Sequence, residues 1–527
     1  MSAGKVSYVF QPETHDSAIV SIGICETISG FSFMQGEAFA QLAKAATGCL
    51  TAYYDASQLM AFDDAGTVMI QVREEDDVRY YAFARDTIGT IHLQYQAPVL
   101  DVFSWPNPAL SLHARSSGAT GFAETFLLHP YGSWDLDIDY ISLPGTVSAC
   151  NLGIGPVKEK SLPDREVKDL CFAFGACHHY TDGGHLHLLM FEEDLRFIDQ
   201  ITQNMARYYA YLETAYPGNA APYFIFLYRK DKKFKIELTG TATRHCCLMG
   251  YGDALVQRYE DIEATLVHEL VHNFLVLDDP DEDLNSLFSE GTADYYATMI
   301  PYALGIHSAE ETIESLNRQL RFFYSNPWKE RSLHEAIACS WTHSYACRVM
   351  YGRGLLFLLH LEALLRKYHA DRPLQGYLAD LMAKREQRLV SLADLLDPID
   401  VLTQGEATQC LHKILQGGPI APPADFLDGF QLEEDTVPIE DQGFDDTVAY
   451  QSPKIVTGLR PSSNACKAGL HDGDEILGKL DEWYSGSHED QPAAFNVRRG
   501  TEIIPVSYLA RGAETYSYKY KKITAPC

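Results

Sequence analysis

The sequence predicts a multidomain protein: an N-terminal antiparallel β domain, a mostly α-helical middle domain and a smaller α+β domain at the C-terminal end. The chain has 527 residues, enough for about three domains at roughly 100–200 residues each. Its 46% hydrophobic and 22% charged residues are typical of globular domains. The hydrophobic pattern has period two at first, becomes helical near residue 165, and returns to short strands after a stretch rich in Pro, Gly and acidic residues. We place the domains at 1–160, 161–420 and 437–527, with a linker at 421–436.

The net charge argues against several classes of partner. A formal charge of −30 repels nucleic acid phosphates and anionic lipid headgroups, so we expect neither nucleic acid nor membrane as a partner. The first residues lack the basic start and apolar stretch of a secretory signal, and the longest apolar segment is interrupted by His360 and Glu362. The 12 cysteines are scattered without a CxxC pair, which favours reduced thiols over disulfides. We therefore expect a soluble, cytoplasmic protein.

The N-terminal domain is predicted from alternation of apolar and polar side chains. Gly, Pro, Asp and Asn separate these segments, as they do between strands. An antiparallel sandwich follows, because such sheets commonly present one apolar and one solvated face. The clearest predicted strands are 66–72, 80–85, 90–95 and 134–141.

Helical spacing marks the middle domain. Apolar residues at steps of three and four predict a helix within 191–216, and a strand follows at 222–229. Residues 354–367 are apolar nearly all round, which predicts a helix buried inside this domain. His185 and His187 alternate with apolar residues, and by that period we interpret them as ordinary strand side chains.

The segment HELVH, residues 268–272, contains candidate metal ligands and a candidate catalytic base. His268 and His272 are four residues apart, about 40° around a helix, so both imidazoles can face one metal ion. Glu269 lies close enough to reach a water on that ion without binding it. A catalytic zinc needs a third protein ligand, and Glu290 supplies one at the start of a new helical stretch, after a loop of turn residues. Asp294 lies on the same helix face as Glu290 and is placed to accept the remaining N–H of a zinc-bound histidine.

The pattern predicts one Zn²⁺ per chain. Two alternatives remain: an amphipathic helix that carries histidines without metal, and a structural zinc. The first must satisfy two half-buried imidazoles by other means. The second normally uses cysteine ligands and closes the fourth position.

HELVH followed by FSEGTADYYA resembles the gluzincin metallopeptidases, and YGRGLLFLLHLEALLR resembles the Tyr-x-Lys-Gly helix of glycyl aminopeptidases and aminopeptidase N relatives. NACKAGLHDGDEIL resembles a protease-associated PDZ domain. Together the three domains resemble the glycyl aminopeptidase family. The resemblance implies a thermolysin-like catalytic domain, a C-terminal PDZ-like domain and a peptide or protein substrate.

Carried over residue by residue, the resemblance implies His268, His272 and Glu290 as zinc ligands, Glu269 as general base and Tyr351 as the oxyanion donor. These roles fit peptide hydrolysis, in which zinc polarises the carbonyl and a base passes the proton of water to the leaving amine. Without the resemblance, the sequence pattern alone favours a structural interpretation, in which Tyr351 caps a buried helix.

The chain departs from the family at two places. Glycyl aminopeptidases carry Gly-Gly-Leu-Glu-His before the zinc motif, and its glutamate meets the substrate's free amine; here the corresponding stretch, GTATRHCCLMG, places Arg244 there, followed by His245. Arg244 and His245 are therefore the predicted substrate contacts. Because a guanidinium repels an ammonium group, specificity for a free amino terminus stays open. The family's Lys is Arg353 here.

The last domain is expected to use Gly469 and Gly473 as turns that frame a helix end and a strand. PDZ domains bind a peptide C-terminus by adding it to a sheet edge, so a peptide C-terminus is a partner that the resemblance implies. A PDZ-like domain that merely packs on the catalytic domain is equally open.

The residues favour a zinc metallopeptidase, aminopeptidase-like by resemblance, in which Glu269 activates water. One alternative is an inactive homologue that serves as a PDZ-bearing scaffold. Another is an endopeptidase without amino-terminal specificity.

Overall fold

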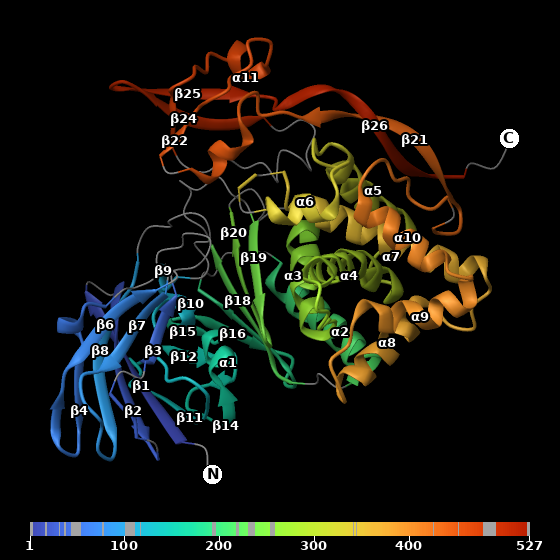
Figure 1. Ribbon diagram of the computed structural model, residues 1–527. Coiled ribbons are helices and arrows are strands. Elements are labelled where there is room, and N and C mark those ends of the chain that lie inside the picture. Colours follow the sequence, from blue (N-terminus) through green and yellow to red (C-terminus); the bar gives the residue numbers. More distant parts are fainter. Residues whose placement is uncertain are drawn as a thin grey trace. The chain divides into compact units, whose positions relative to one another are not determined.

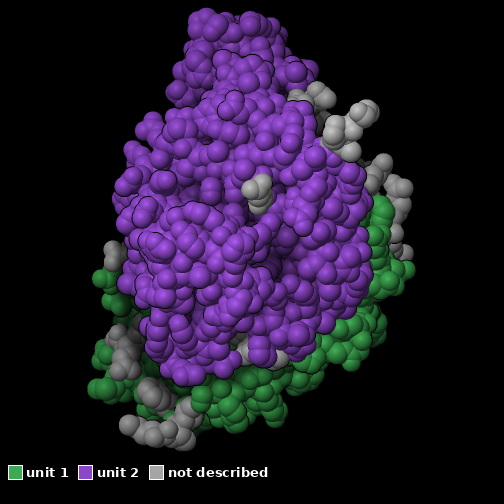
Figure 2. Space-filling view, turned by 90° about the vertical axis from the view of Figure 1, so that its right-hand side faces the viewer, with its two compact units in different colours: residues 1–203, 221–231, 238–259 green, residues 204–220, 232–237, 260–527 purple. Residues whose placement is uncertain are grey.

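The computed structural model falls into two compact units (Figure 2). The first holds residues 1–203, 221–231 and 238–259, and the second holds 204–220, 232–237 and 260–527. Each is described by itself. The described residues are 4–15, 18–30, 32–35, 38–43, 54–75, 78–100, 111–115, 117–191, 197–217, 221–229, 238–252, 259–340, 342–343, 345–424, 426–451, 453–477 and 492–523.

The first unit is built from sheets (Figure 1). A seven-stranded sheet has the order β14-β11-β1-β2-β8-β4-β5, a five-stranded sheet the order β13-β12-β15-β10-β9, and a three-stranded sheet the order β3-β7-β6. Their bounds are β1 Gly4–His15, β2 Ala18–Ser29, β3 Ala38–Ala43, β4 Met60–Asp63, β5 Gly66–Val68, β6 Ile70–Glu75, β7 Val78–Phe83, β8 Ile91–Pro98, β9 His113–Arg115, β10 Gly118–Phe122, β11 Ser133–Tyr140, β12 Val147–Cys150, β13 Gly153–Ile154, β14 Val157–Pro163 and β15 Cys171–Gly175. The short helix α1 spans Asp164–Lys168.

The predicted N-terminal β domain is confirmed, and its two larger sheets share one core. Phe10 of β1 lies 4.9 Å from Phe172 of β15, measured between ring centroids. The prediction of a purely antiparallel sheet is wrong, because β1 pairs with β11 in parallel. A long stretch of chain separates these two strands, and no alternation pattern records which distant strand a given strand pairs with.

A further five-stranded sheet completes the first unit. Its order is β16-β17-β18-β20-β19, with bounds β16 His178–Thr181, β17 Leu186–Met190, β18 Tyr223–Arg229, β19 Leu238–Thr243 and β20 Cys246–Tyr251. Successive residues of β15 point to opposite faces, so Phe172 joins the sandwich core and Ala173 joins a second core with Phe226. The sheet that holds β15 is therefore buried on both faces at this strand, where the prediction had one face solvated.

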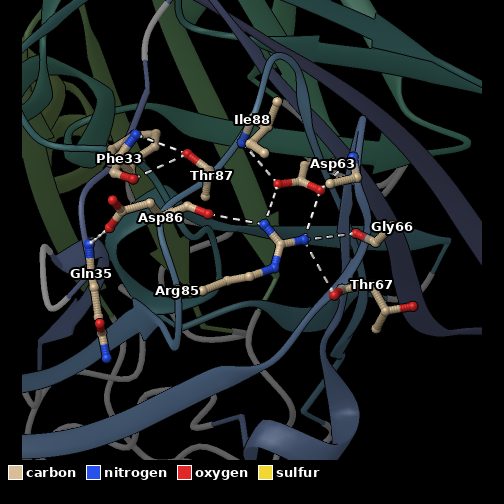
Figure 3. A network of polar contacts seen from close by, with 10 residues as sticks. Phe33, Gln35, Asp63, Gly66, Thr67, Arg85, Asp86, Thr87 and Ile88 are labelled. Atoms are coloured by element: carbon tan, nitrogen blue, oxygen red, sulfur yellow. Dashed lines mark hydrogen bonds and ion pairs between the residues drawn. The ribbon is translucent and has the colours of Figure 1, made fainter.

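A polar network fixes the β4–β5 hairpin to the segment before β8 (Figure 3). Arg85 donates to both carboxylate oxygens of Asp63, at 2.7 and 2.8 Å, and the Ile88 amide donates to the same carboxylate at 2.9 Å. The hydrogen bond from Arg85 holds the pKa of Asp63 well below its usual range. Since the Asp63 side chain is fully buried, this bidentate pair is stronger than an exposed salt bridge.

Helices dominate the second unit, as predicted. The predicted buried helix at 354–367 is confirmed within α7, where Leu356, Phe357, Leu358 and Leu359 are all 0% exposed. Of the helices, α2 and α3 begin in the first unit and continue into the second. The bounds are α2 Ile198–Ala215, α3 Tyr259–Phe274, α4 Glu282–Ala303, α5 Ala309–Tyr324, α6 Leu333–Ala338, α7 Arg348–Lys367, α8 Leu374–Arg385, α9 Leu392–Thr403 and α10 Glu406–Gln416. No helix in the described part of the chain has both the length and the apolar character needed to cross a membrane.

The C-terminal part of the second unit combines a long two-stranded ribbon with a small domain. The ribbon pairs β21, Phe430–Glu440, with β26, Arg511–Lys522, so residues 430–436 of the predicted linker form a strand. The small domain has the sheet order β22-β23-β24-β25, with bounds β22 Lys454–Ile455, β23 Glu475–Leu477, β24 Ala493–Arg499 and β25 Glu502–Tyr508, and the helix α11 Asn464–Lys467. Gly469 and Gly473 both have φ of +90°, as expected of the predicted turns.

The small domain has a core of its own, and the ribbon packs against α5. Tyr518 of β26 lies 5.3 Å from Tyr324, measured between ring centroids. At the end of β21, Glu440 forms a fully buried ion pair of 2.5 Å with Arg348, in the first turn of α7. Breaking one partner of such a pair is costly, so the ribbon is a fixed part of the helical unit. The core residues of the small domain include Val448, Val456, Leu470, Ile476, Val497 and Val506.

Candidate metal centre

Helix α3 presents two histidines on one face. His268 and His272 lie one turn apart, and their Nε2 atoms are 3.1 Å from each other. The opposite side of this helix is anchored by apolar side chains, including Leu266, Leu270 and Phe274, each 0% exposed. Burial of that face leaves the histidines as the polar edge of an otherwise apolar helix, and their side chains are 13% and 18% exposed.

Helix α4 brings the carboxylate. It begins at Glu282, capped by Asp281, whose side chain accepts from the Asp283 amide at 3.0 Å. The predicted start of this helix at Glu290 is therefore wrong by two turns, because several residues read as loop form its first turns. Capping by an aspartate explains the difference, since Asp favours both turns and helix N-termini.

The three side chains converge on one point. Glu290 Oε2 lies 3.2 Å from His268 Nε2 and 3.8 Å from His272 Nε2, and one atom from each residue falls within 4.8 Å of the others. Within the described part of the chain, this Oε2 atom is buried and has no partner of hydrogen-bond geometry. Two imidazoles and one carboxylate are the donor set of many catalytic zinc sites. The residues therefore fit a zinc ion with an open fourth position.

Each histidine also has a partner for its second ring nitrogen. Asp294 Oδ1 lies 2.9 Å from His268 Nδ1, at the place the sequence predicts for it. Ser289 Oγ lies 3.0 Å from His272 Nδ1, which the sequence analysis missed. Because two zinc-bound histidines need two acceptors, a search for a second polar residue beside Glu290 would have found Ser289. Both contacts leave Nε2 of each ring free to face the metal.

Replacing Ser289 by alanine should weaken zinc binding about 10- to 100-fold, because the ring of His272 loses the acceptor that orients it. Ser289→Thr keeps a hydroxyl and serves as the matched control. Competition for zinc against a chelator of known affinity measures both variants. Equal affinity of Ser289→Ala and the parent protein would rule out this positioning role.

The ionisation states of the three groups depend on one another. Burial disfavours the charged form of His268, but its hydrogen bond to the Asp294 carboxylate and its close contact with the Glu290 carboxylate outweigh burial and raise its pKa well above the usual value. Burial and the neighbouring charge of His268 lower the pKa of His272 to about 4. Burial raises the pKa of Glu290, yet its contacts with His268 outweigh this and the pKa is lowered. At neutral pH the Glu290 carboxylate is thus ionised and His272 is neutral, as metal ligands must be, whereas His268 would have to release a proton on binding a metal.

Tyr351 lies at the same cluster. Its ring is stacked 5.8 Å from the ring of His268, and its hydroxyl hydrogen-bonds Glu290. Burial raises the pKa of Tyr351 well above its usual value, and the charges of Glu290 and Glu269 add to this effect. The phenol therefore keeps its proton and remains a hydrogen-bond donor. Glu269 is 8% exposed and lies on α3 directly after His268.

A close crossing of α4 and α7 brings Glu290 and Tyr351 together. Gly291 follows Glu290, Gly354 lies one turn after Tyr351, and the two glycines touch. A Cβ added at Gly291 would lie 2.6 Å from the Gly354 carbonyl carbon, and one added at Gly354 would lie 2.6 Å from Gly291 Cα. Since the separation of packed helices is set by the side chains at their contact, only glycine permits this approach.

The predicted substrate contacts belong to the first unit. Arg244 and His245 form the turn between β19 and β20, where Arg244 pairs with Glu166 and its carbonyl accepts from Asn151 at 2.8 Å. His245 adopts φ of +61°. The guanidinium is thus already engaged with a carboxylate. The role of both residues toward substrate stays a prediction.

Arg353, which replaces the family's lysine, has a structural position. It is fully buried and donates to the backbone carbonyls of Ile414 and Lys329, both at 2.8 Å. Desolvation lowers its pKa to about 10. The planar guanidinium offers five donors in a fixed fork and so reaches carbonyls that lie apart, whereas a lysine has three donors on a single nitrogen.

Comparison with solved structures identifies the fold of this chain. An aminopeptidase N family protein from Idiomarina loihiensis superimposes with a TM-score of 0.68 and 13% identity, over 98% of this chain and 98% of that chain. This chain has the same fold. No protein-family model matches the sequence, and no curated protein matches it either. The predicted combination of a β-rich N-terminal domain with a helical region is therefore confirmed. This architecture is of the aminopeptidase N type.

Two further solved structures are less similar. An M1 zinc metallopeptidase from Deinococcus radiodurans gives a TM-score of 0.49 and 13% identity, over 80% of this chain and 96% of that chain. Leukotriene A4 hydrolase from Saccharomyces cerevisiae gives a TM-score of 0.49 and 12% identity, over 81% of this chain and 69% of that chain. The glycyl aminopeptidase and PDZ resemblances stay predictions.

Proposed function

We propose that the chain is a zinc-dependent metallopeptidase that hydrolyses peptide bonds. The observation that carries this proposal is the convergence of His268, His272 and Glu290 within 4.8 Å, with Glu269 next to one of the histidines. A structural zinc fits less well, because such sites favour cysteine and close the fourth position. The aminopeptidase N type of fold supports the proposal at the level of architecture.

The three ligands would hold one zinc ion, which supplies a Lewis acid for the scissile carbonyl and lowers the pKa of a water to about 7. Glu269 takes the proton of the attacking water and passes it to the leaving amine. The Tyr351 hydroxyl donates to the oxygen on which negative charge develops. Asp294 and Ser289 hold the imidazoles of His268 and His272 in the tautomer that faces the metal.

Specificity for a free amino terminus is the finer part of the proposal. Arg244 stands where the family has a glutamate, which disfavours an ammonium group at that place. The ion pair with Glu166 offsets part of that charge. We therefore keep two substrate classes, peptides with a free amine and internal peptide bonds, and let the assay decide between them.

For the C-terminal domain we propose a PDZ-like role in holding a peptide C-terminus. Its separate core and the left-handed turns at Gly469 and Gly473 support this domain type. The strands at the ends of its sheet are β22 and β25, and a peptide binds a PDZ sheet by adding to an edge. In the alternative reading the domain only packs on the helical unit, to which the adjoining ribbon is tied by the buried Arg348–Glu440 pair.

The decisive experiment pairs metal analysis with cleavage of matched peptides. Near-stoichiometric zinc and cleavage that is lost on chelation are expected, and a free-amine peptide is compared with its N-acetylated form. Preference for the free amine identifies an aminopeptidase, and equal cleavage of both forms identifies an endopeptidase. Folded protein that has neither zinc nor activity would overturn the proposal in favour of a scaffold.

A further inference from the structure

Helix α3 carries a buried carboxylate that lies outside the metal cluster. Glu263 is 2% exposed, and its carboxylate meets side chains from two other segments of the second unit. The Asn204 amide donates to Oε1 at 3.0 Å, and the Tyr208 hydroxyl donates to the same oxygen. On the other oxygen, His307 Nε2 lies 2.9 Å from Oε2. Asn204 and Tyr208 belong to α2, and His307 lies between α4 and α5, so one carboxylate joins α3 to two neighbouring segments.

The place of Glu263 on α3 decides what these contacts can do. Glu263 comes nine residues before His272, which is about 180° around a helix of 3.6 residues per turn, so the two side chains point in opposite directions. It continues the apolar stripe of Leu266, Leu270 and Phe274 that anchors this side of the helix. Apolar contacts are non-directional, whereas hydrogen bonds to a buried carboxylate require one orientation of the helix. The contacts of Glu263 therefore fix the rotation of α3 about its axis.

The same contacts reach helix α4, which carries Glu290. The His307 amide donates to the carbonyl of Pro301, in the last turn of α4, at 3.1 Å. The contact between His307 and Glu263 thus ties the end of α4 to the second turn of α3. Since the candidate zinc ligands come from these two helices, this contact bears on both parts of the metal centre.

His307 and Glu263 form an ion pair when the imidazole is protonated. The hydrogen bond with Glu263 raises the pKa of His307 above its usual value of about 6.5, against the opposing effect of burial. The charges of Glu311, on α5, and of Glu260, on α3, also raise it. From α2 the pair meets an amide and a phenol. The side chains of His307 and Glu263 are 19% and 2% exposed, so solvent screens this pair less than a surface pair.

We propose that Glu263 and His307 are positioning residues of the metal centre. Their ion pair holds α3 against α2 and the end of α4, and so keeps His268 and His272 turned toward Glu290. This role rests on the metal centre of the proposed function. Two competing explanations are a neutral hydrogen bond and an ion pair that serves folding alone.

The pH at which the ion pair acts follows from the direction of the shift. Its contribution to stability is fully present below about pH 6.5, where a histidine of the unfolded chain is protonated. It is lost as the pH rises through the raised pKa of His307 in the folded protein. A neutral hydrogen bond would contribute equally across this range.

The first measurement is the melting temperature of metal-free, full-length protein between about pH 6 and about pH 9. His307→Gln should melt several degrees below the parent protein at the acid end, because glutamine keeps an N–H donor but removes the charge. The gap should close as the pH rises, and Glu263→Gln should show the same closing gap. His334→Gln is the matched control: His334 forms an exposed pair with Asp283, so this variant should melt at the temperature of the parent throughout.

The second measurement is zinc affinity at the acid end of this range, by competition with a chelator of known affinity. His307→Gln should bind zinc about tenfold more weakly than the parent, the lower end of what loss of an outer partner costs, although no ligand has changed. Asp400→Asn is the control for stability. Asp400 accepts from the amides of Ala407 and Thr408 at the start of α10, so this change should lower the melting temperature and leave zinc affinity unchanged.

A melting gap that stays constant from acid to alkaline pH would overturn the ion pair. A gap that closes while His307→Gln binds zinc as tightly as the parent would overturn the positioning role and leave an ion pair that serves folding alone. A parent protein that holds no zinc would contradict the proposed metallopeptidase, and the positioning role with it. In that case the closing gap would still separate the ion pair from a neutral contact.

Discussion

Replacing Glu269 by glutamine is expected to lower peptide hydrolysis by about 10²- to 10⁴-fold or more while bound zinc stays at the level of the parent protein. The amide cannot accept the proton of the attacking water, so the base is lost. The zinc ligands do not change, because Glu269 lies beside His268 on α3 and is not a member of the metal cluster. Turnover of a peptide substrate and elemental analysis of the same preparation measure the two quantities together.

Glu260→Gln is the control for this experiment. It makes the same substitution in the same helix, at an exposed position in the first turn, and should leave both turnover and zinc unchanged. If Glu269→Gln turned over as fast as the parent, Glu269 would not be the base. If it lost zinc as well, the separation of base from ligands would be wrong.

The second large effect is expected at Glu290. Glutamine keeps the size of the side chain but removes the charge, and the site then offers two neutral imidazoles and a weak amide donor to a divalent cation. Metal affinity should fall by more than the roughly 100-fold that loss of an outer partner costs. Glu290→Gln should therefore lose its zinc on dialysis against a chelator concentration that leaves the parent protein loaded, and hydrolysis should be lost with the metal.

Two comparisons sharpen this prediction. Glu282→Gln makes the same change at an exposed position in the first turn of α4 and should retain zinc. Asp294→Asn removes the charge of the carboxylate that contacts His268 and should give an intermediate loss. Zinc retained by Glu290→Gln at the parent level would exclude Glu290 as the third ligand.

Local spacing accounts for what the sequence could predict at the site. Two histidines one helical turn apart must share a face, so the pair on α3 follows from the HELVH segment alone. The position of Glu290 in the third turn of α4 does not follow in the same way, because the Asp281 cap and the loop before it contain the same residue types. Ser289 was missed since a serine carries no periodic signal.

Tertiary pairing accounts for much of the rest. The parallel partnership of β1 with β11 joins strands that are far apart along the chain. In the predicted linker, the strand at 430–436 could not be predicted from local pattern, because its ladder of backbone hydrogen bonds is made with the distant strand β26. The structural role of Arg353 likewise depends on distant parts of the chain, because its guanidinium donates to the backbone carbonyls of residues 329 and 414.

The contact between Gly291 and Gly354 limits which substitutions this protein can accept during evolution. Neither glycine has a functional group, yet a side chain at either one would push apart the helices that carry Glu290 and Tyr351. Because the two backbones meet each other, neither position can change first and be compensated by the other. A variant that keeps the present spacing of these two helices, and with it the metal centre, must therefore keep both glycines.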